Sequence, residues 1–145
     1  MESGFQIESI ISGIKQDIAS QNISIAKQYL ASSYYERMMA EFKQQEEIII
    51  VGSGVYGLRL FEMLEAEGKS SAVKCFCDNS RERQELRIRN LEVLPVREAV
   101  LGYPDAYYII TPKKYENELL RQLVHLGISV DHISIYIFMH TGLVD

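Results

Sequence analysis

The feature that most constrains the fold is a run of β-branched residues that ends in closely spaced glycines. The run IIIV covers residues 48–51, and the stretch GSGVYG that follows has the spacing G-x-G-x-x-G. Four consecutive apolar residues are typical of a strand that is covered on both faces. Apolar residues then recur with helical spacing from Leu58 to Leu64. The glycines therefore mark a sharp turn between a buried strand and an amphipathic helix.

The rest of the chain repeats this alternation of short apolar runs and helical patterns. Further helices are predicted after Pro95 and from Tyr115 to Leu126, with Gly127 as the C-cap of the second. Strands that alternate with helices form parallel sheets with right-handed crossovers. We therefore expect an α/β fold: a small open parallel sheet of about five strands with helices on both faces. The predicted strands are residues 48–51, 72–77, 91–94, 105–110 and 132–138.

Residues 1–45 follow a different pattern from residues 46–145. Isoleucines from Ile7 to Ile18 share one helical face, and a second apolar stripe runs from Ile23 to Phe42. We interpret residues 1–45 as a helical extension of an α/β domain at residues 46–145. The extension either covers the sheet or forms an interface with a second copy or a partner, because aromatic residues and methionines are enriched at interfaces. These residues are Tyr29, Tyr34, Tyr35, Met38, Met39 and Phe42.

Charge and composition narrow the classes of function. The net charge of −5 argues against a broad nucleic-acid surface, so no nucleic-acid partner is expected. The start MESGFQIES lacks the features of a signal peptide, and no apolar run is long enough to span a bilayer, which predicts a cytoplasmic protein without a membrane span. Cys75 and Cys77 form a single pair, too few ligands for a zinc site, and read as small buried side chains without a metal.

The glycine turn has two readings. In a phosphate-binding turn, the first glycine (Gly52) permits the tight turn and the second (Gly54) lets a pyrophosphate approach the backbone. The third (Gly57) lets the helix pack closely on the strand. The amides at the helix start then face the anion, aided by the helix dipole. In the other reading, the glycines serve only the packing of strand against helix.

Polar residues at three predicted strand ends favour a ligand site. Ser53, Asp78 and Thr111 each follow a different strand, and ligands of open parallel sheets bind beyond the carboxyl ends of the strands. Asp78 comes about 20 residues after the last glycine, where an acidic side chain accepts hydrogen bonds from ribose hydroxyls. Tyr56 lies inside the turn and either contacts the ligand or packs. We therefore predict a small nucleotide ligand at this edge.

Several stretches resemble a known group of domains. IIIVGSGVYGLRLFEMLEAEG, CFCDNS, LEVLPVREA and DAYYIITPKKYENELLRQLVHLGI are similar to the Rossmann-type nucleotide-binding domain of nucleoside-diphosphate-sugar-handling proteins. Such domains stand at the front of sugar acyl- and acetyltransferases and of some sugar-modifying methyltransferases, and similar folds carry NAD in redox-sensing repressors. The resemblance covers residues 47–136. It implies a phosphate turn of Gly52, Ser53, Gly54 and Gly57, a nucleoside against Asp78 and Asn79, and a wall of Thr111 and Pro112.

The sequence departs from that group at two positions. Glu85 and Asn90 stand where the group has glycines in the loop after the Asp-Asn pair. Asparagine tolerates a left-handed backbone, so Asn90 is a mild change. Glu85 leaves the shape of this loop open.

The resemblance and the residues leave three functions open. The first is binding of a nucleotide sugar, as a module of a larger enzyme in polysaccharide biosynthesis. The second is an NAD(H)-binding regulatory domain, and the third is an interaction module with a degenerate site. Asp78 opposes a 2′-phosphate even though Arg81 and Arg83 lie near it in sequence, so an unphosphorylated ribose is expected. We assign no catalytic residue.

Overall fold

The structure, a computed structural model, describes residue 25 and residues 32–137. The chain divides into two compact units, Met1–Met38 with Met139–Asp145, and Met39–Phe138. In the first unit, residue 25 and residues 32–38 are helical. The helix predicted over residues 7–18 lies outside the described residues, and so does the last residue of the final predicted strand.

The second unit is built on a six-stranded sheet of order β3-β4-β2-β1-β5-β6. Five strands are parallel, and the edge strand β3 is antiparallel to β4. The predicted α/β class and the five parallel strands are therefore confirmed. The strands are β1 (Ile48–Val51), β2 (Val73–Cys77), β3 (Arg87–Ile88), β4 (Leu91–Leu94), β5 (Tyr107–Ile110) and β6 (Ile133–Ile135).

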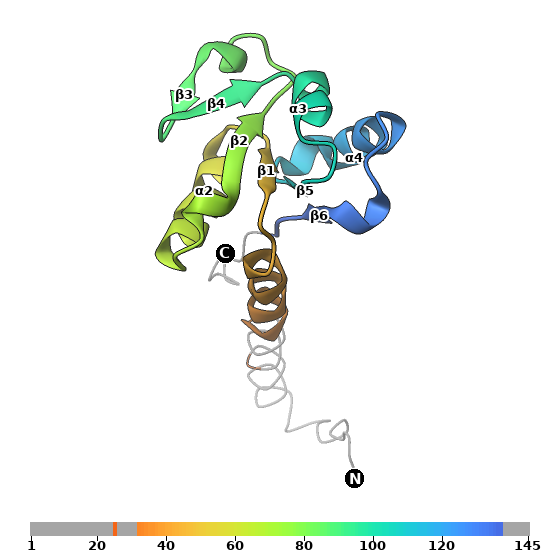
Figure 1. Cartoon of the computed structure of the whole chain (residues 1–145). Helices are drawn as coiled ribbons and strands as arrows, with labels where there is room; N and C mark the ends of the chain where they lie inside the picture. The colour runs from red at the N-terminus through yellow and green to blue at the C-terminus, as the bar shows by residue number, and fades with distance from the viewer. Residues whose placement is uncertain (1–24, 26–31, 138–145) are drawn as a thin grey trace. The chain divides into compact units, whose positions relative to one another are not determined.

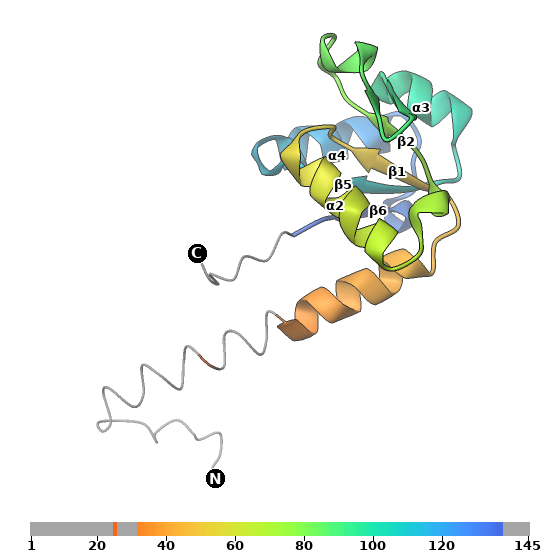
Figure 2. The same ribbon diagram turned by 90° about the vertical axis from the view of Figure 1, so that its left-hand side faces the viewer.

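Helices cover both faces of the sheet, as expected. Helices α3 (Val96–Gly102) and α4 (Glu116–His125) lie on one side, and α2 (Val55–Ala66) lies on the other (Figure 1). Figure 2 shows α2 running across the front of the strands. Short 3₁₀ turns complete the connections: η2 (Ser70–Ala72), η3 (Arg83–Glu85), η4 (Lys113–Tyr115) and η5 (Val130–His132).

Successive side chains of β1 point to opposite faces of the sheet, so its four apolar residues pack against the helices on both sides. Ile49 and Val51 belong to the core beneath α3 and α4. Ile50 points to the opposite face, where its Cγ2 lies 3.4 Å from the position that a Cβ on Gly57 of α2 would take. All four residues of β1 are fully buried. A strand with two covered faces therefore has no polar position.

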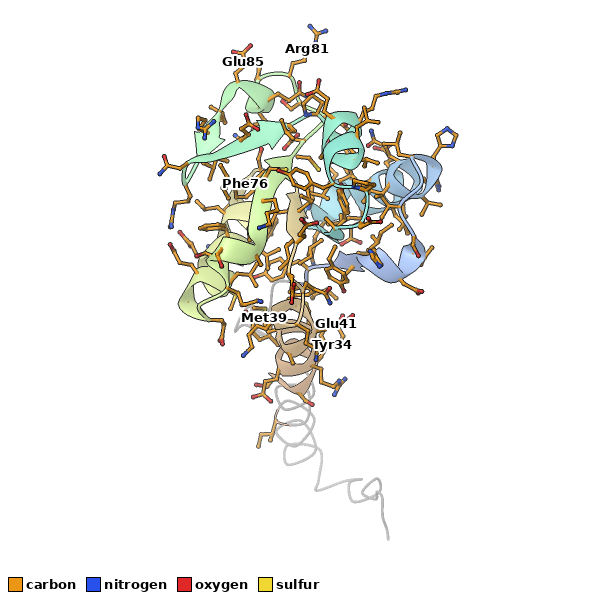
Figure 3. All side chains as sticks on the ribbon, in the orientation of Figure 1. Tyr34, Met39, Glu41, Phe76, Arg81 and Glu85 are labelled. Carbon is orange, nitrogen blue, oxygen red and sulfur yellow. The ribbon has the colours of Figure 1, made fainter. Side chains whose placement is uncertain are left out.

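Aromatic pairs fill the α2 side of the sheet. The Phe61 ring of α2 packs on Phe76 of β2 with centroids 6.1 Å apart, and Figure 3 shows Phe76 inside the fold. Phe42, from the helical residues 39–43, packs on Tyr107 of β5 with centroids 6.2 Å apart. Phe42 is completely buried. This residue of the apolar N-terminal stripe therefore covers the sheet.

Strand β3 was not predicted. It pairs with β4 through a hairpin whose two turn residues, Arg89 and Asn90, have φ angles of +53° and +67°. Positive φ at both central residues is the geometry that matches the twist of two-residue hairpins. Asn90, which stands where the similar domains have a glycine, thus adopts a left-handed backbone. Glu85 instead lies in the 3₁₀ turn η3.

Candidate functional site

The order of the strands reverses at β1. The chain runs from β1 outward through β2 to β4 and then returns to β5 and β6 on the other side of β1. Val51, the last residue of β1, is paired with Cys77 of β2 and Ile110 of β5. The residues that follow these three strand ends therefore emerge together at one edge of the sheet, where ligands of such folds bind.

The three glycines of the turn have different surroundings. Gly52 has φ of +104°, and a Cβ there would lie 2.5 Å from Oγ1 of Thr111. A Cβ on Gly57 would collide with the backbone oxygen of Gly52. A Cβ on Gly54 would meet no atom within 4 Å. Packing thus requires glycine at positions 52 and 57, whereas position 54 borders open space that a side chain would fill.

Helix α2 begins directly at this open space. Gly54 is its N-cap residue and makes no side-chain capping bond, and the first turn carries no acidic residue. The first amides of an α-helix have no acceptor within the helix, and the macrodipole adds positive potential there. Tyr56 lies in this first turn and is half-buried. The helix start is suited to a negatively charged group.

Asp78 is joined to the turn through Ser53. Its Oδ2 accepts hydrogen bonds from the backbone nitrogen of Ser53 at 3.0 Å and from the Ser53 hydroxyl at 2.8 Å. Its Oδ1 accepts a third bond from the backbone nitrogen of Ser80 at 3.0 Å. The side chain at the end of β2 and the turn after β1, which the sequence placed on neighbouring strands, are therefore in direct contact.

Arg83 also contacts the turn, which the sequence did not predict. Its Nε donates to Oγ of Ser53 at 3.0 Å, and its Nη2 donates to the Ser53 carbonyl oxygen at 2.5 Å. A backbone hydrogen bond positions Arg83: its nitrogen donates to the carbonyl oxygen of Ser80 at 3.1 Å. Ser80 in turn is held by Asp78. The signal in the sequence was the run Asp-Asn-Ser, which is typical of tight turns.

A cavity of about 300 Å³ adjoins Asp78. It lies between the ends of β1 and β2, the residues after β5, and the first half of α4, and its surface is mostly apolar. Tyr115 and Pro112 form the wall after β5. Ligand pockets in proteins begin at about this volume. The cavity is of a size to receive part of a nucleotide.

Two side-chain amides bridge the loop after β2 and helix α4. Nδ2 of Asn79 donates to Oε1 of Gln122 at 2.8 Å, and Nε2 of Gln122 donates back to Oδ1 of Asn79 at 3.3 Å. Asn79 lines the cavity, so this pair stands beside it. Gln122 is a residue that sequence reasoning missed, because nothing local marks a contact across 43 residues.

Thr111 serves the backbone of the turn. It is buried, and its hydroxyl donates to the carbonyl oxygen of Val51 at 2.8 Å. The same side chain borders Gly52. Lys113 and Lys114 are exposed in η4, where Nζ of Lys114 lies 5.6 Å from the centroid of the Tyr115 ring. The structure therefore gathers Gly52, Ser53, Asp78 and Thr111 at one edge, with Asn79 at its border.

The two cysteines of β2, Cys75 and Cys77, are both buried and unreactive. Burial raises the pKa of the Cys75 thiol to about 12, with a smaller contribution from the carboxylate of Glu92. Burial also raises the pKa of Cys77, with Cys75 and then Asp78 adding to the effect. A neutral buried thiol is not a nucleophile. Within residue 25 and residues 32–137, no group of three or more metal-binding side chains comes together.

No protein-family model matches the sequence. No curated protein matches it either. Solved structures do: RSP, a Rex-family repressor, is similar with a TM-score of 0.52 and 20% identity over 66% of this chain and 54% of that chain. The structure of RSP in complex with β-NADH is similar with a TM-score of 0.52 and 18% identity, over 83% of this chain and 69% of that chain. The structure of RSP in complex with β-NAD⁺ and operator DNA has a TM-score of 0.47 and 19% identity, over 63% of this chain and 50% of that chain.

The fold is Rossmann-like. This chain spans between half and about two thirds of the RSP chains that it matches. The Rossmann-type domain implied by the resemblance is supported. Its sugar-handling side is not supported, since the matched structures are those of a repressor, one of them in complex with β-NADH.

The expectation that the protein has no nucleic-acid partner is corrected by these comparisons. An RSP structure holds operator DNA together with β-NAD⁺. The expectation rested on a net charge of −5, which is a sum over the whole chain. DNA phosphates are bound by a local basic surface, so this sum does not exclude such a partner. In the part of the chain that the structure covers, no helix is long and apolar enough to cross a bilayer.

Proposed function

We propose that this chain is an NAD(H)-binding regulatory domain, with the dinucleotide at the carboxyl edge of the sheet between β1 and β5. The observation that carries the proposal is the turn at Gly54, which borders open space at the start of α2. A pyrophosphate needs this combination of a backbone without a side chain and the amides of a helix start. Support also comes from the Rossmann-like fold shared with an NADH complex.

The neighbouring residues would hold the adenosine half. Asp78 lines the cavity and lies against the turn, which suits an acceptor for a ribose hydroxyl. The base would enter the cavity next to Tyr115, which is 48% exposed, and beside the Asn79–Gln122 amide pair. An aromatic ring beside an apolar cavity can stack on a base. The nicotinamide supplies hydride chemistry when bound.

Regulation rather than catalysis is proposed because the polar side chains described at this edge are bonded within the protein, Ser53 to Asp78 and Thr111 to Val51. Cys77 is neutral through burial, and Thr111 uses its hydroxyl on Val51. What remains are groups that bind and orient. A domain that binds NAD(H) without acting on it reports the state of the nicotinamide pool.

Ligand-dependent stability tests the proposal. A ligand present at about 100 times its Kd adds about 2.7 kcal/mol to the free energy of unfolding. Thermal unfolding of the chain should therefore shift upward with NADH or NAD⁺ and not with UDP-, GDP-, CDP- or TDP-sugars. A response to one of the sugars alone would restore the nucleotide-sugar reading, and no response to any of these would favour an interaction module.

The matched variants are Gly54→Val and Gly102→Val. Both glycines have open space around the Cβ position, but Gly102 ends helix α3. Gly54→Val should abolish the shift with NADH because the side chain would occupy the place of the phosphates. Gly102→Val should retain it. An unchanged shift in Gly54→Val would place the ligand elsewhere.

A further inference from the structure

The Arg83 guanidinium and the Asp78 carboxylate are both bonded to the side chain of Ser53. Arg83 and Asp78 contact the same atom from two sides: Oγ of Ser53 accepts from Nε of Arg83 and donates to Oδ2 of Asp78. Asp78 lines the cavity that would receive the adenosine. A positive charge therefore stands one hydrogen-bonded atom away from the carboxylate that would meet the ribose.

Asp78 has little remaining capacity to select an unphosphorylated ribose. A carboxylate offers about four lone-pair sites. Three are taken by Ser53 nitrogen, Ser53 hydroxyl and Ser80 nitrogen. A clamp on two ribose hydroxyls needs two acceptor sites, so this arrangement leaves one short. The internal bonds and the nearby guanidinium also lessen the repulsion that a bare carboxylate would exert on a phosphate.

Arg83, by contrast, retains donors. A guanidinium has five N–H donors in a planar fork that matches a phosphate, and it stays charged at all working pH values. Two donors are used on Ser53. Among the residues that the structure describes, no other acceptor is bonded to the Arg83 side chain. The backbone of η3 holds it in place, because Arg83 nitrogen bonds to Ser80.

We propose that Arg83 reads a 2′-phosphate on the adenosine ribose, so that the site takes NADP(H) at least as well as NAD(H). This inference rests on the proposed dinucleotide site and revises the expectation of an unphosphorylated ribose. Arg81 has no such role: it is exposed, and Figure 3 shows it at the outer end of the loop, pointing away from the fold.

Titration calorimetry of the whole chain with NADH and NADPH tests the inference. Wild type should bind NADPH at least as tightly as NADH. Arg83→Gln removes the bonds to Ser53 for both cofactors, but only NADPH also loses a charge-assisted hydrogen bond to its 2′-phosphate. The variant should therefore weaken NADPH by at least about tenfold more than it weakens NADH. Arg81→Gln removes the same charge nearby and should change neither. Retained NADH binding shows that Arg83→Gln is folded.

Two smaller ligands that differ only in the 2′-phosphate measure the contribution of that group to binding. Adenosine 2′,5′-bisphosphate should bind wild type more tightly than adenosine 5′-monophosphate, and Arg83→Gln should remove that difference. Wild type that binds NADH but binds NADPH at least tenfold more weakly overturns the inference and leaves the proposed function standing. Equal weakening of both cofactors by Arg83→Gln overturns it too, because Arg83 would then read the pyrophosphate. If neither cofactor binds wild type, both proposals fall.

Discussion

Ser53 and Asp78, 25 positions apart, are joined by two hydrogen bonds to a single carboxylate oxygen, at 2.8 Å from the hydroxyl and 3.0 Å from the backbone nitrogen. The turn after β1 and the end of β2 thus form one polar unit. The same carboxylate orders the next loop through Ser80. Any change at Asp78 acts on both segments.

Asp78→Asn should destabilise the fold by about 1–2 kcal/mol. All three groups that contact the carboxylate are donors, and an amide would turn one NH₂ toward a donor. Denaturant unfolding of the free protein measures the effect. Asp105→Asn is the control, because Asp105 is exposed and should change stability by less than about 0.5 kcal/mol. Equal stability of Asp78→Asn and wild type would show that the Ser53–Asp78 contact contributes nothing.

Gly57→Ala and Gly54→Ala should differ sharply in stability. The added Cβ at Gly57 would collide with the backbone oxygen of Gly52, so α2 must move from β1 at a loss of about 2–3 kcal/mol. The Cβ at Gly54 meets no atom within 4 Å, and the loss there should be about 1 kcal/mol or less. Thermal unfolding of both variants without ligand gives the comparison. A reversed order would contradict the packing described for the turn.

Alkaline pH should destabilise the protein through Cys75. Its pKa is raised from 9.0 to about 12, so between these values the folded thiol stays protonated while the unfolded thiol ionises. The unfolded state then binds fewer protons, and the free energy of unfolding falls by about 1.4 kcal/mol per pH unit above pH 9. Burial acts in the same direction on the pKa of Cys77 and of Tyr108.

Cys75→Ala isolates the contribution of this thiol. Urea unfolding at several pH values from 8 to 10.5, under reducing conditions, should show a shallower decline in the variant than in wild type. At pH 10.5 the difference in the pH-dependent loss should reach about 2 kcal/mol. Parallel declines in the two proteins would mean that the Cys75 thiol is not buried as described.

Asn90→Gly should be tolerated and Asn90→Val should not. Asn90 has φ of +67°, a backbone that glycine adopts without strain and that a β-branched residue adopts at a loss of about 1–2 kcal/mol. The glycine variant should stay within about 0.5 kcal/mol of wild type. Chemical denaturation of the two variants decides it. A harmless valine would show that the hairpin turn differs from the one described.

The sequence predicted the elements that rest on local pattern. Residues Ile48–Val51 are apolar throughout because both faces of β1 are covered, and the glycines after them mark the turn to α2. Asp78 could be placed near the turn because parallel strands end at one edge. Strand β3 could not be found, since its two residues, Arg87 and Ile88, show no pattern of alternation.

The contacts that decide ligand chemistry depend on side chains far apart in sequence. Arg83 reaches Ser53 across 30 positions, and only the 3₁₀ turn after Ser80 brings it there. The sequence shows that Arg83 is close to Asp78, but it does not show where the Arg83 side chain points. On sequence alone, Arg81 and Arg83 cannot be told apart. The pairing of Asn79 with Gln122 depends likewise on how α4 crosses the sheet.

The contacts of Thr111 with the end of β1 affect how a ligand would bind to the turn. Its nitrogen and its hydroxyl both donate to the carbonyl oxygen of Val51, at 3.0 Å and 2.8 Å, and its side chain lies against Gly52. The left-handed backbone at Gly52 is thereby held by the residue that follows β5. An incoming phosphate would meet a preorganised receptor, and its affinity would not be diminished by the entropy of ordering the loop.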